Sequence, residues 1–508
     1  MVYIHGGEFQ FGGKDFYGPQ YLLDHDVILV TINYRLGVLG FMSTGDDFCP
    51  GNFGIHDQIE ALKWISYNIQ AFDGNPYNVT VFGHDSGAIS VSILLTASRS
   101  WGLFHNVMIL SGSVFTPNAI KIPDIKTSID FSQVLNCDLK YSSIDQNIER
   151  ISQPLVECLR SKSIEDLMFA SRLPGLYPNE FQYTFGPVLD KNVSTSILPD
   201  LPIRLFLSGN YWKTPMVAGL TLNEGSLDFY THYDKIRDWS FDEKAYYLYN
   251  KYKYNEFYAK VLTKSVEWYY FKRFNDTIYT PNPYYNINRF NQIGVQIKPY
   301  LKQNKNQELF EKEKQDITLI ESIGDFMYGS ANTLLLDIHS KNTEQTYLYV
   351  VEHRGLKTFG TLQHKGSQNI HRNQYGVSHM DDIFYLFPTL YNDNNTSTYD
   401  EPVIRTMCQF FAHFARFGRF GQYTPVFGIN WIQYSTINPN YLRILSLNTQ
   451  MSKGFRSDFL SFWNYFIREV FDDFYAKKQN DSQISAQFVG TVQLRGMIKF
   501  GHNKFLIN

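Results

Sequence analysis

An aspartate lies at the turn where the chain's strongest chemical motif would place a nucleophilic hydroxyl. Residues 78–88, NVTVFGHDSGA, predict a β-branched strand, a turn bounded by Gly83 and Gly87, and the start of a helix. This strand–turn–helix context is that of G-x-S-x-G, the turn that exposes a catalytic serine. The central position falls on Asp85, and a shift by one residue to Ser86 would remove both flanking glycines.

A carboxylate at this position changes the chemistry of the turn. Acyl transfer needs a hydroxyl whose proton passes to a histidine, and an ionised carboxylate has no such proton. Its attack on an ester carbonyl would give a mixed anhydride, and its charge would oppose the oxyanion that develops nearby. Two unit charges about 4 Å apart interact by about 4 kcal/mol at an effective dielectric constant near 20. We therefore predict that ester hydrolysis by the usual serine mechanism is lost at Asp85.

The composition is that of a large globular protein. The chain has 508 residues, of which 44% are hydrophobic and 19% charged, and this is enough to bury a substantial core. A formal net charge of −3 gives no indication of nucleic acid or an anionic membrane as a partner. The sequence has no run of 18 or more apolar residues, so membrane attachment is not visible in it.

The chain begins inside a second motif of the same chemistry. An apolar strand at residues 1–4 runs directly into residues 5–9, HGGEF. An HGGG-type loop follows an inner strand of the sheet, where its backbone N–H groups form part of an oxyanion hole. We therefore expect earlier strands to be missing, so that the sequence is truncated at its N-terminus. Residues 1–20 lack the basic start and apolar core of a signal peptide.

Together, these motifs resemble the type-B carboxylesterase/cholinesterase family, from residue 1 to about residue 475. The other matching stretches are residues 33–41 (NYRLGVLGF), 50–58 (PGNFGIHDQ), 102–105 with 111–113, 222–226 (LNEGS) and 376–382 (GVSHMDD). The resemblance implies an α/β-hydrolase fold, a twisted mixed sheet flanked by helices, here N-terminally truncated. It predicts a carboxylesterase type-B domain at 1–478 that lacks its N-terminal part, and a C-terminal tail at 479–508 with no assigned structure.

Periodicity along the chain agrees with an α/β architecture. Strand-like runs occur at 1–4, 27–34, 78–83, 106–110, 215–220 and 346–351. Between two of them, residues 57–70 place apolar side chains at helical spacing, which predicts a helix packed on the sheet. In this family the region from about 240 to 315 would be helical and would cover the active-site gorge.

The resemblance also assigns the remaining site residues. His379 would be the general base and Glu224 its orienting acid, following Asp85 in the chain order of this fold. The backbone N–H groups of Gly7, Glu8 and Ser86 would form the oxyanion hole. We expect Asp85, His379 and Glu224 to form a carboxylate–imidazolium–carboxylate cluster, and we expect no cofactor and no metal.

Cysteines and sequons point to the secretory route. The resemblance implies a disulfide between Cys137 and Cys158, the alternative being two buried free thiols. Cys408 is expected in the core, whereas Cys49 is either free or paired with a missing segment. Six sequons are candidate glycosylation sites: Asn78, Asn192, Asn275, Asn394, Asn395 and Asn480. The predicted location is secreted, or on the extracellular side of the plasma membrane.

Three hypotheses for function follow from the altered elbow. The first is a catalytically inactive protein of extracellular recognition or adhesion with a protein partner, because the elbow resembles those of the serine-lacking neuroligin, neurotactin, glutactin and gliotactin members. The second is a hydrolase that uses Asp85 as nucleophile, as haloalkane dehalogenases and soluble epoxide hydrolases do, although no other motif of theirs is present. The third is a carboxylic ester hydrolase with a small ester substrate, in which the aspartate is a sequence error.

Overall fold

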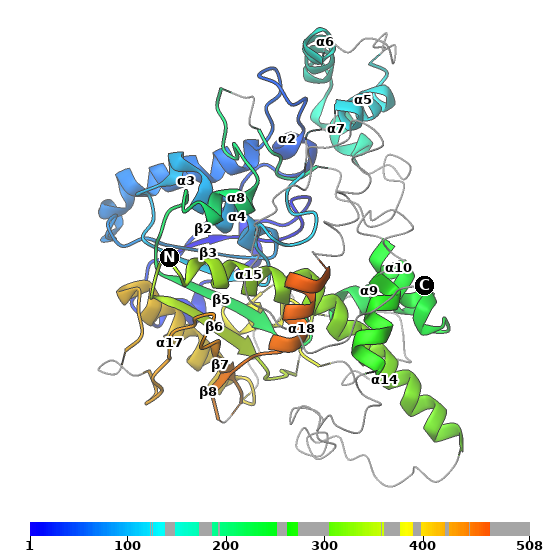
Figure 1. Cartoon of the computed structure of the whole chain (residues 1–508). Helices are drawn as coiled ribbons and strands as arrows, with labels where there is room; N and C mark the ends of the chain where they lie inside the picture. The colour runs from blue at the N-terminus through cyan, green and yellow to red at the C-terminus, as the bar shows by residue number, and fades with distance from the viewer. Residues whose placement is uncertain are drawn as a thin grey trace.

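A computed structural model of the chain shows the fold (Figure 1). It describes residues 1–121, 123, 125–137, 148–171, 185–190, 194–250, 262–272, 304–356, 358–359, 376–389, 398–421, 426–446 and 448–467. The predicted tail at 479–508 lies outside these residues.

One eight-stranded sheet organises the molecule, in the order β2-β1-β3-β4-β5-β6-β7-β8. Its strands are β1 (Val2–Ile4), β2 (Val30–Ile32), β3 (Thr80–His84), β4 (Asn106–Leu110), β5 (Met216–Thr221), β6 (Thr346–Val351), β7 (Asn440–Ile444) and β8 (Gln450–Lys453). All neighbours run parallel except β7 and β8, which pair antiparallel. The sheet is therefore mixed, as the sequence predicted.

Strand β1 has an inner position, which confirms that the HGGEF loop follows an inner strand. Its neighbours are β3 on one side and β2 on the other, with Val2 beside both Val81 and Val30. Because β2 comes later in the chain, the inner position of β1 does not require earlier strands. The expected N-terminal truncation therefore stays a prediction.

The central strands are buried on both faces, as expected for parallel strands covered by helices. Every residue of β3, β4, β5 and β6 is buried. Alternate residues enter two separate cores. One core takes Val81, Val107, Ala218 and Leu348, and the other takes Phe82, Met108, Val217 and Tyr347. The period of two in each strand thus divides the side chains between two helical layers.

Helices cover the two faces unequally (Figure 1). The first core is closed by α3 (Phe53–Asn68), α4 (Ser86–Thr96) and α15 (Ser330–His339), and the second by α17 (Glu401–Phe417). The predicted helix at 57–70 is α3 with the 3-10 turn Ile69–Phe72, and its apolar stripe is buried at Ile59, Leu62, Ile65 and Ile69.

A third core lies beside the sheet. It is formed by α9 (Ser226–Ile236), α10 (Phe241–Asn250), the turn Glu267–Lys272, α14 (Asn304–Gly324) and α18 (Ser457–Ser461). These helices include the described parts of the region 240–315, which was predicted to be helical. The other α-helices of the described residues are α1 (Gln20–Leu23), α2 (Gly37–Phe41), α5 (Ile125–Val134), α6 (Ile148–Arg160), α7 (Ile164–Ala170) and α8 (Pro202–Leu207).

The structure contains the disulfide that the resemblance implied. Cys137, after α5, is bonded to Cys158 in α6, with 6.0 Å between their Cα atoms. Cys49 and Cys408 are buried free thiols. The bridge holds together two helices that pack against each other at the top of the view in Figure 1, away from the sheet.

The candidate glycosylation sites fall largely outside the described residues. Asn192, Asn275, Asn394, Asn395 and Asn480 all lie there. Asn78 is described, and its side-chain amide donates to the carbonyl oxygen of Arg416 at 3.1 Å. Its Oδ1 accepts from the amide of Asn106. Glycosylation at Asn78 stays a prediction.

Candidate functional site

The elbow between β3 and α4 has the backbone that the sequence predicted. Asp85 takes φ 54° and ψ −123°, a conformation that most residues avoid. Its side chain is half-buried. A Cβ atom at Gly83 would lie 2.5 Å from the carbonyl carbon of Gly87, and one at Gly87 would lie 2.0 Å from the carbonyl oxygen of Ile4. Both glycines are therefore required by close packing of β1, β3 and α4.

The carboxylate of Asp85 is bound by two of the N–H groups that were predicted to form an oxyanion hole. Its Oδ2 atom accepts hydrogen bonds from the N–H groups of Gly7 at 2.9 Å and Glu8 at 3.0 Å. Positive φ angles at Gly7 (113°) and Glu8 (61°) accompany this geometry. Two of the three predicted donors thus converge on one point, and a carboxylate oxygen already fills it. Charge-assisted bonds of this kind are about twice as strong as neutral ones.

Ser86 does not join this group in the described structure. Its N–H donates no hydrogen bond to the Asp85 carboxylate among the described residues, and its buried Oγ atom has no partner there. The serine begins α4, one residue after the strained position.

Glu224 and His379 meet as predicted. His379 Nδ1 lies 2.7 Å from Glu224 Oε2, and both side chains are buried. The Oε1 atom of Glu224 accepts from the hydroxyl of Ser111 at 2.6 Å and from the N–H of Thr221 at 2.7 Å. The carboxylate is therefore held from three directions, and its imidazole partner has one defined orientation.

The loops that carry this pair are joined by backbone contacts. Asn223 and Ser378 form an isolated parallel bridge, and the N–H of Asn223 donates to the carbonyl of Val377 at 2.9 Å. The side-chain oxygen of Asn223 accepts in turn from the N–H of Val377 at 3.1 Å. Residues 155 positions apart in the chain are thereby fixed next to each other.

The surroundings of His379 favour its charged form. Burial lowers the pKa of His379, but the hydrogen bond and charge of Glu224 outweigh it, with further contributions from the charges of Asp85 and Asp382. The net result is a raised pKa. Asp85 thus stabilises an imidazolium, which accords with the expected cluster of two carboxylates and one cation.

The contacts of that cluster differ from the expectation in one respect. In the described structure Asp85 makes its hydrogen bonds to Gly7 and Glu8, not to the imidazole of His379. It acts on His379 through its charge alone. The physical reason is that two N–H donors of the loop converge on the carboxylate, and backbone donors cannot be left unsatisfied at low cost.

Several neighbours of His379 were not predicted from the sequence. The ring of Tyr328 is stacked on the imidazole with 4.4 Å between centroids, and His84 lies on it at 4.5 Å. Ser111 and Asp382 belong to quoted motifs, 111–113 and 376–382, and that was the only sequence signal for them. Tyr328 lies in a π-helical turn, Asp325–Gly329, that no motif marked.

A second pair of titratable groups lies beside this site. His84 Nε2 lies 3.7 Å from Asp382 Oδ1, and neither atom has a hydrogen-bond partner among the described residues. Burial, followed by the positive charge of His379, lowers the pKa of His84 well below its usual range. Burial and the charge of Glu224 raise the pKa of Asp382 to about 7. The surroundings of His84 thus favour its neutral form.

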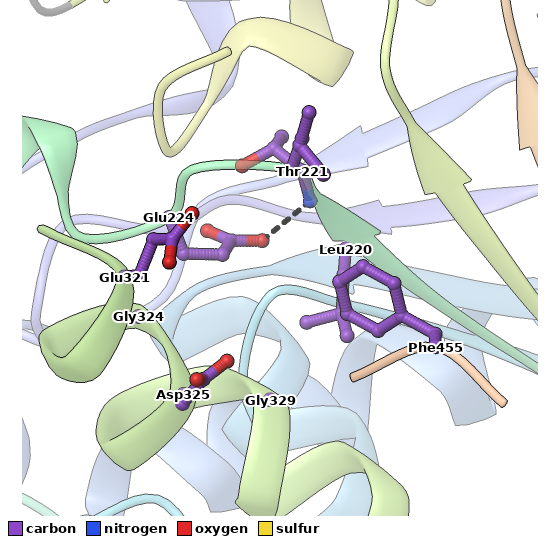
Figure 2. A pocket seen from close by; sticks show the side chains of 9 residues that line it. Leu220, Thr221, Glu224, Glu321, Gly324, Asp325, Gly329 and Phe455 are labelled. Atoms are coloured by element: carbon purple, nitrogen blue, oxygen red, sulfur yellow. Dashed lines mark hydrogen bonds between the residues drawn. The ribbon is translucent and has the colours of Figure 1, made fainter. Parts of the chain in front are cut away.

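Behind Glu224 lies a buried group of charges around a small cavity (Figure 2). Thr221, Glu224, Glu321 and Asp325 line this cavity. Arg456 binds Asp325 with two hydrogen bonds of 2.7 and 2.6 Å, and its Nη1 atom lies 3.2 Å from Glu321. Burial, only partly opposed by Arg456, raises the pKa of Glu321 to about 7.

Within the part of the chain that the structure describes, no three side chains of His, Cys, Asp or Glu lie close enough together to hold a metal ion. No helix among the described residues is long and apolar enough to cross a membrane.

Comparison with known proteins identifies the family. The model of the carboxylesterase family matches residues 1–463. With this match, the eight-stranded sheet and the elbow between β3 and α4, the chain belongs to the carboxylesterase family and has an α/β-hydrolase fold.

Relatives of two kinds resemble this chain. Neuroligin-3 of Mus musculus is 36% identical over 226 residues, which are 44% of this chain and 25% of that protein. A carboxylic ester hydrolase of Bombus ignitus is 27% identical over 479 residues, or 91% of this chain and 75% of that protein. Esterase FE4 of Myzus persicae is 42% identical over 207 residues, 40% of this chain and 35% of that protein. The chain thus spans about a quarter of the neuroligin that it matches.

Proposed function

We propose that this protein does not hydrolyse carboxylic esters and that it acts in extracellular recognition, with a protein as its partner. The observation that carries the first half is the position of Asp85 Oδ2 between the N–H groups of Gly7 and Glu8. An ester carbonyl would need the same two donors in its transition state. A fixed negative charge in that place excludes the oxyanion and supplies no hydroxyl nucleophile.

Recognition is the role that the neuroligin relatives support, whereas the esterase relatives keep the third hypothesis open. The 36% identity to neuroligin-3 covers 44% of the chain. The elbow resembles those of family members without the serine, which work in adhesion. The disulfide between Cys137 and Cys158 fits an oxidising compartment.

The direct test is an assay of the purified protein with short-chain aryl and thiocholine esters. We expect no turnover above a control without protein. Turnover that disappears in the variant His379→Ala would contradict the proposal, because it would show that the imidazole still supports hydrolysis. Binding of the soluble chain to cell surfaces should, by contrast, be unchanged in His379→Ala.

A rescue variant tests the assignment of the site itself. Asp85→Ser returns a hydroxyl to the elbow, frees the N–H groups of Gly7 and Glu8, and leaves the bonded pair of Glu224 and His379 in place. We expect a trace of esterase activity and covalent labelling of the new hydroxyl by an organophosphate. Losing one oxyanion donor costs about 3–4 kcal/mol in known enzymes, so freeing two is a large change.

The matched control is Asp85→Ala, which removes the same charge without supplying a nucleophile and should take no label. If folded Asp85→Ser also takes none, while an active esterase is labelled under the same conditions, the assigned triad geometry is wrong.

A further inference from the structure

The small cavity behind Glu224 is large enough for one water molecule. Its volume is about 10 Å³, which is close to the least space that a water molecule needs. A larger ligand does not fit. The lining includes four polar side chains (Figure 2), those of Thr221, Glu224, Glu321 and Asp325.

Two polar atoms at this cavity have no hydrogen-bond partner among the described residues. They are Oγ1 of Thr221 and Oε1 of Glu321, and the two residues are only 1% and 7% exposed. The other oxygen of Glu321 lies 3.2 Å from Arg456, and the N–H of Thr221 donates to Glu224 at 2.7 Å. A buried hydroxyl or carboxylate oxygen without a partner lowers stability, and the loss is larger for a charged group. Both atoms therefore require a partner within the cavity.

We propose that the cavity binds one water molecule, which accepts a hydrogen bond from the hydroxyl of Thr221 and donates one to Oε1 of Glu321. Buried water molecules typically make about three hydrogen bonds to groups that would otherwise be unsatisfied. The carboxylates of Glu224 and Asp325 line the same cavity, and either can accept the second hydrogen of the water.

The charges around the cavity favour a neutral ligand over a cation. Arg456 already binds Asp325 with two hydrogen bonds and lies beside Glu321. The third carboxylate, that of Glu224, is paired with His379. Among the described residues, no three acidic or histidine side chains lie close enough together to hold a metal ion. A molecule that both accepts and donates hydrogen bonds therefore fits this set of groups best.

The water joins two parts of the molecule that belong to different layers. Glu321 lies in α14, and Thr221 is the last residue of β5. Through its N–H, Thr221 holds Glu224, which in turn orients His379. A hydrogen bond from water stabilises the ionised form of Glu321, so the water lowers the pKa of this group against the effect of burial.

The variant Thr221→Val tests the assignment, because it replaces the hydroxyl by a methyl group of similar size and keeps the N–H that holds Glu224. Without its donor the water is lost, and ionised Glu321 loses a hydrogen bond that corresponds to about 1–2 pKa units. Stability falls as the pH rises above 4.5, until Glu321 is ionised in the folded protein. We expect this fall to end about 1–2 pH units higher in the variant than in the parent. Urea denaturation of the full chain at a series of pH values measures it.

Two controls separate the loss of the water from a general loss of stability. Thr96→Val removes another buried hydroxyl, which donates to the carbonyl oxygen of Ile93 at 2.8 Å. It should lower stability without moving the pH at which the fall ends. In a Glu321→Gln background, Thr221→Val should not move that pH either. Equal pH profiles for the parent and Thr221→Val would overturn the proposal.

A crystal structure of the full chain identifies the occupant directly. We expect one peak of electron density about 2.6–3.1 Å from both Oγ1 of Thr221 and Oε1 of Glu321, and no peak in Thr221→Val. A peak surrounded by several oxygens at about 2.3–2.6 Å would be a metal ion and would overturn the assignment to water. A direct hydrogen bond between Thr221 and Glu321, with no peak between them, would overturn it as well.

Discussion

Asp85 and Asp325 both lie near the pair of Glu224 and His379, Asp85 on the side of the imidazole and Asp325 on the side of the carboxylate, yet their contacts differ. Asp325 is bound by Arg456 through two short hydrogen bonds and by the hydroxyl of Tyr270 at 2.7 Å, and it is buried. Among the described residues, Asp85 is hydrogen-bonded through one oxygen, by backbone N–H groups, and it is half-buried. The carboxylate of Asp325 has a cation on both oxygens and belongs to the core, whereas the carboxylate of Asp85 is held by main-chain dipoles.

The difference teaches where a negative charge is sealed in the core and where it is only half-buried. At Asp325 the charge is compensated within the protein, so removing its partner leaves an uncompensated buried charge. At Asp85 the side chain is half-buried, so we expect a smaller loss of stability when its contacts are removed. The following variants separate the two cases.

The largest expected effect is at Arg456. The change Arg456→Met keeps the length of the side chain but leaves Asp325 and Glu321 without their cation, since both lie within 3.2 Å of it. We expect the free energy of unfolding to fall by about 3–5 kcal/mol. Urea denaturation followed by tryptophan fluorescence measures it.

The control is Arg405→Ala, which breaks an exposed pair with Glu401. Such pairs contribute about 0.2–1 kcal/mol. Equal losses in the two arginine variants would mean that the Arg456 cluster is not sealed from water.

A smaller effect is expected at Glu321, and it depends on pH. Burial raises the pKa of Glu321 from 4.5 to about 7, so the folded state binds its proton more tightly than the unfolded state. The contribution of Glu321 to stability is full below about pH 4.5 and is lost as the pH rises through about 7. Over that window the loss is on the order of 3 kcal/mol.

The variant Glu321→Gln removes this dependence. Its stability relative to the parent should therefore increase between pH 5 and pH 7.5, measured by denaturation at a series of pH values. Burial also raises the pKa values of Asp381 and Asp382 to about 7. Both residues are present in the parent and in the variant, so their contributions to the pH dependence of stability cancel in the comparison. A constant difference across this range would show that Glu321 stays charged in the folded protein.

The smallest effect is at Asp85. Asp85→Ala removes the acceptor for two backbone N–H groups, but water can reach a half-buried site and replace it. We expect a change in the free energy of unfolding of about 1 kcal/mol or less. Thermal unfolding of the parent and the variant side by side checks this. A loss as large as that of Arg456→Met would mean that Asp85 is a structural residue, and would remove the contrast between the two aspartates.

The sequence by itself determined the local features of the site. The spacing of Gly83 and Gly87 around Asp85 predicted the elbow, because only glycine fits where β1, β3 and α4 approach so closely. Motifs around Glu224 and His379 predicted the pair, and the structure brings the two side chains to 2.7 Å. Apolar strand-like runs separated by a segment of helical period predicted the α/β sheet, because both patterns are local properties of the chain.

Only the tertiary structure decided which groups the carboxylates contact. Gly7 donates to a residue 78 positions later, and Arg456 binds one 131 positions earlier. Such pairings depend on how separate loops pack against the sheet, and the spacing of residues within one loop carries no information on them. The sequence therefore predicted a negative charge at the elbow, but only the fold placed one of its oxygens between the N–H groups of Gly7 and Glu8.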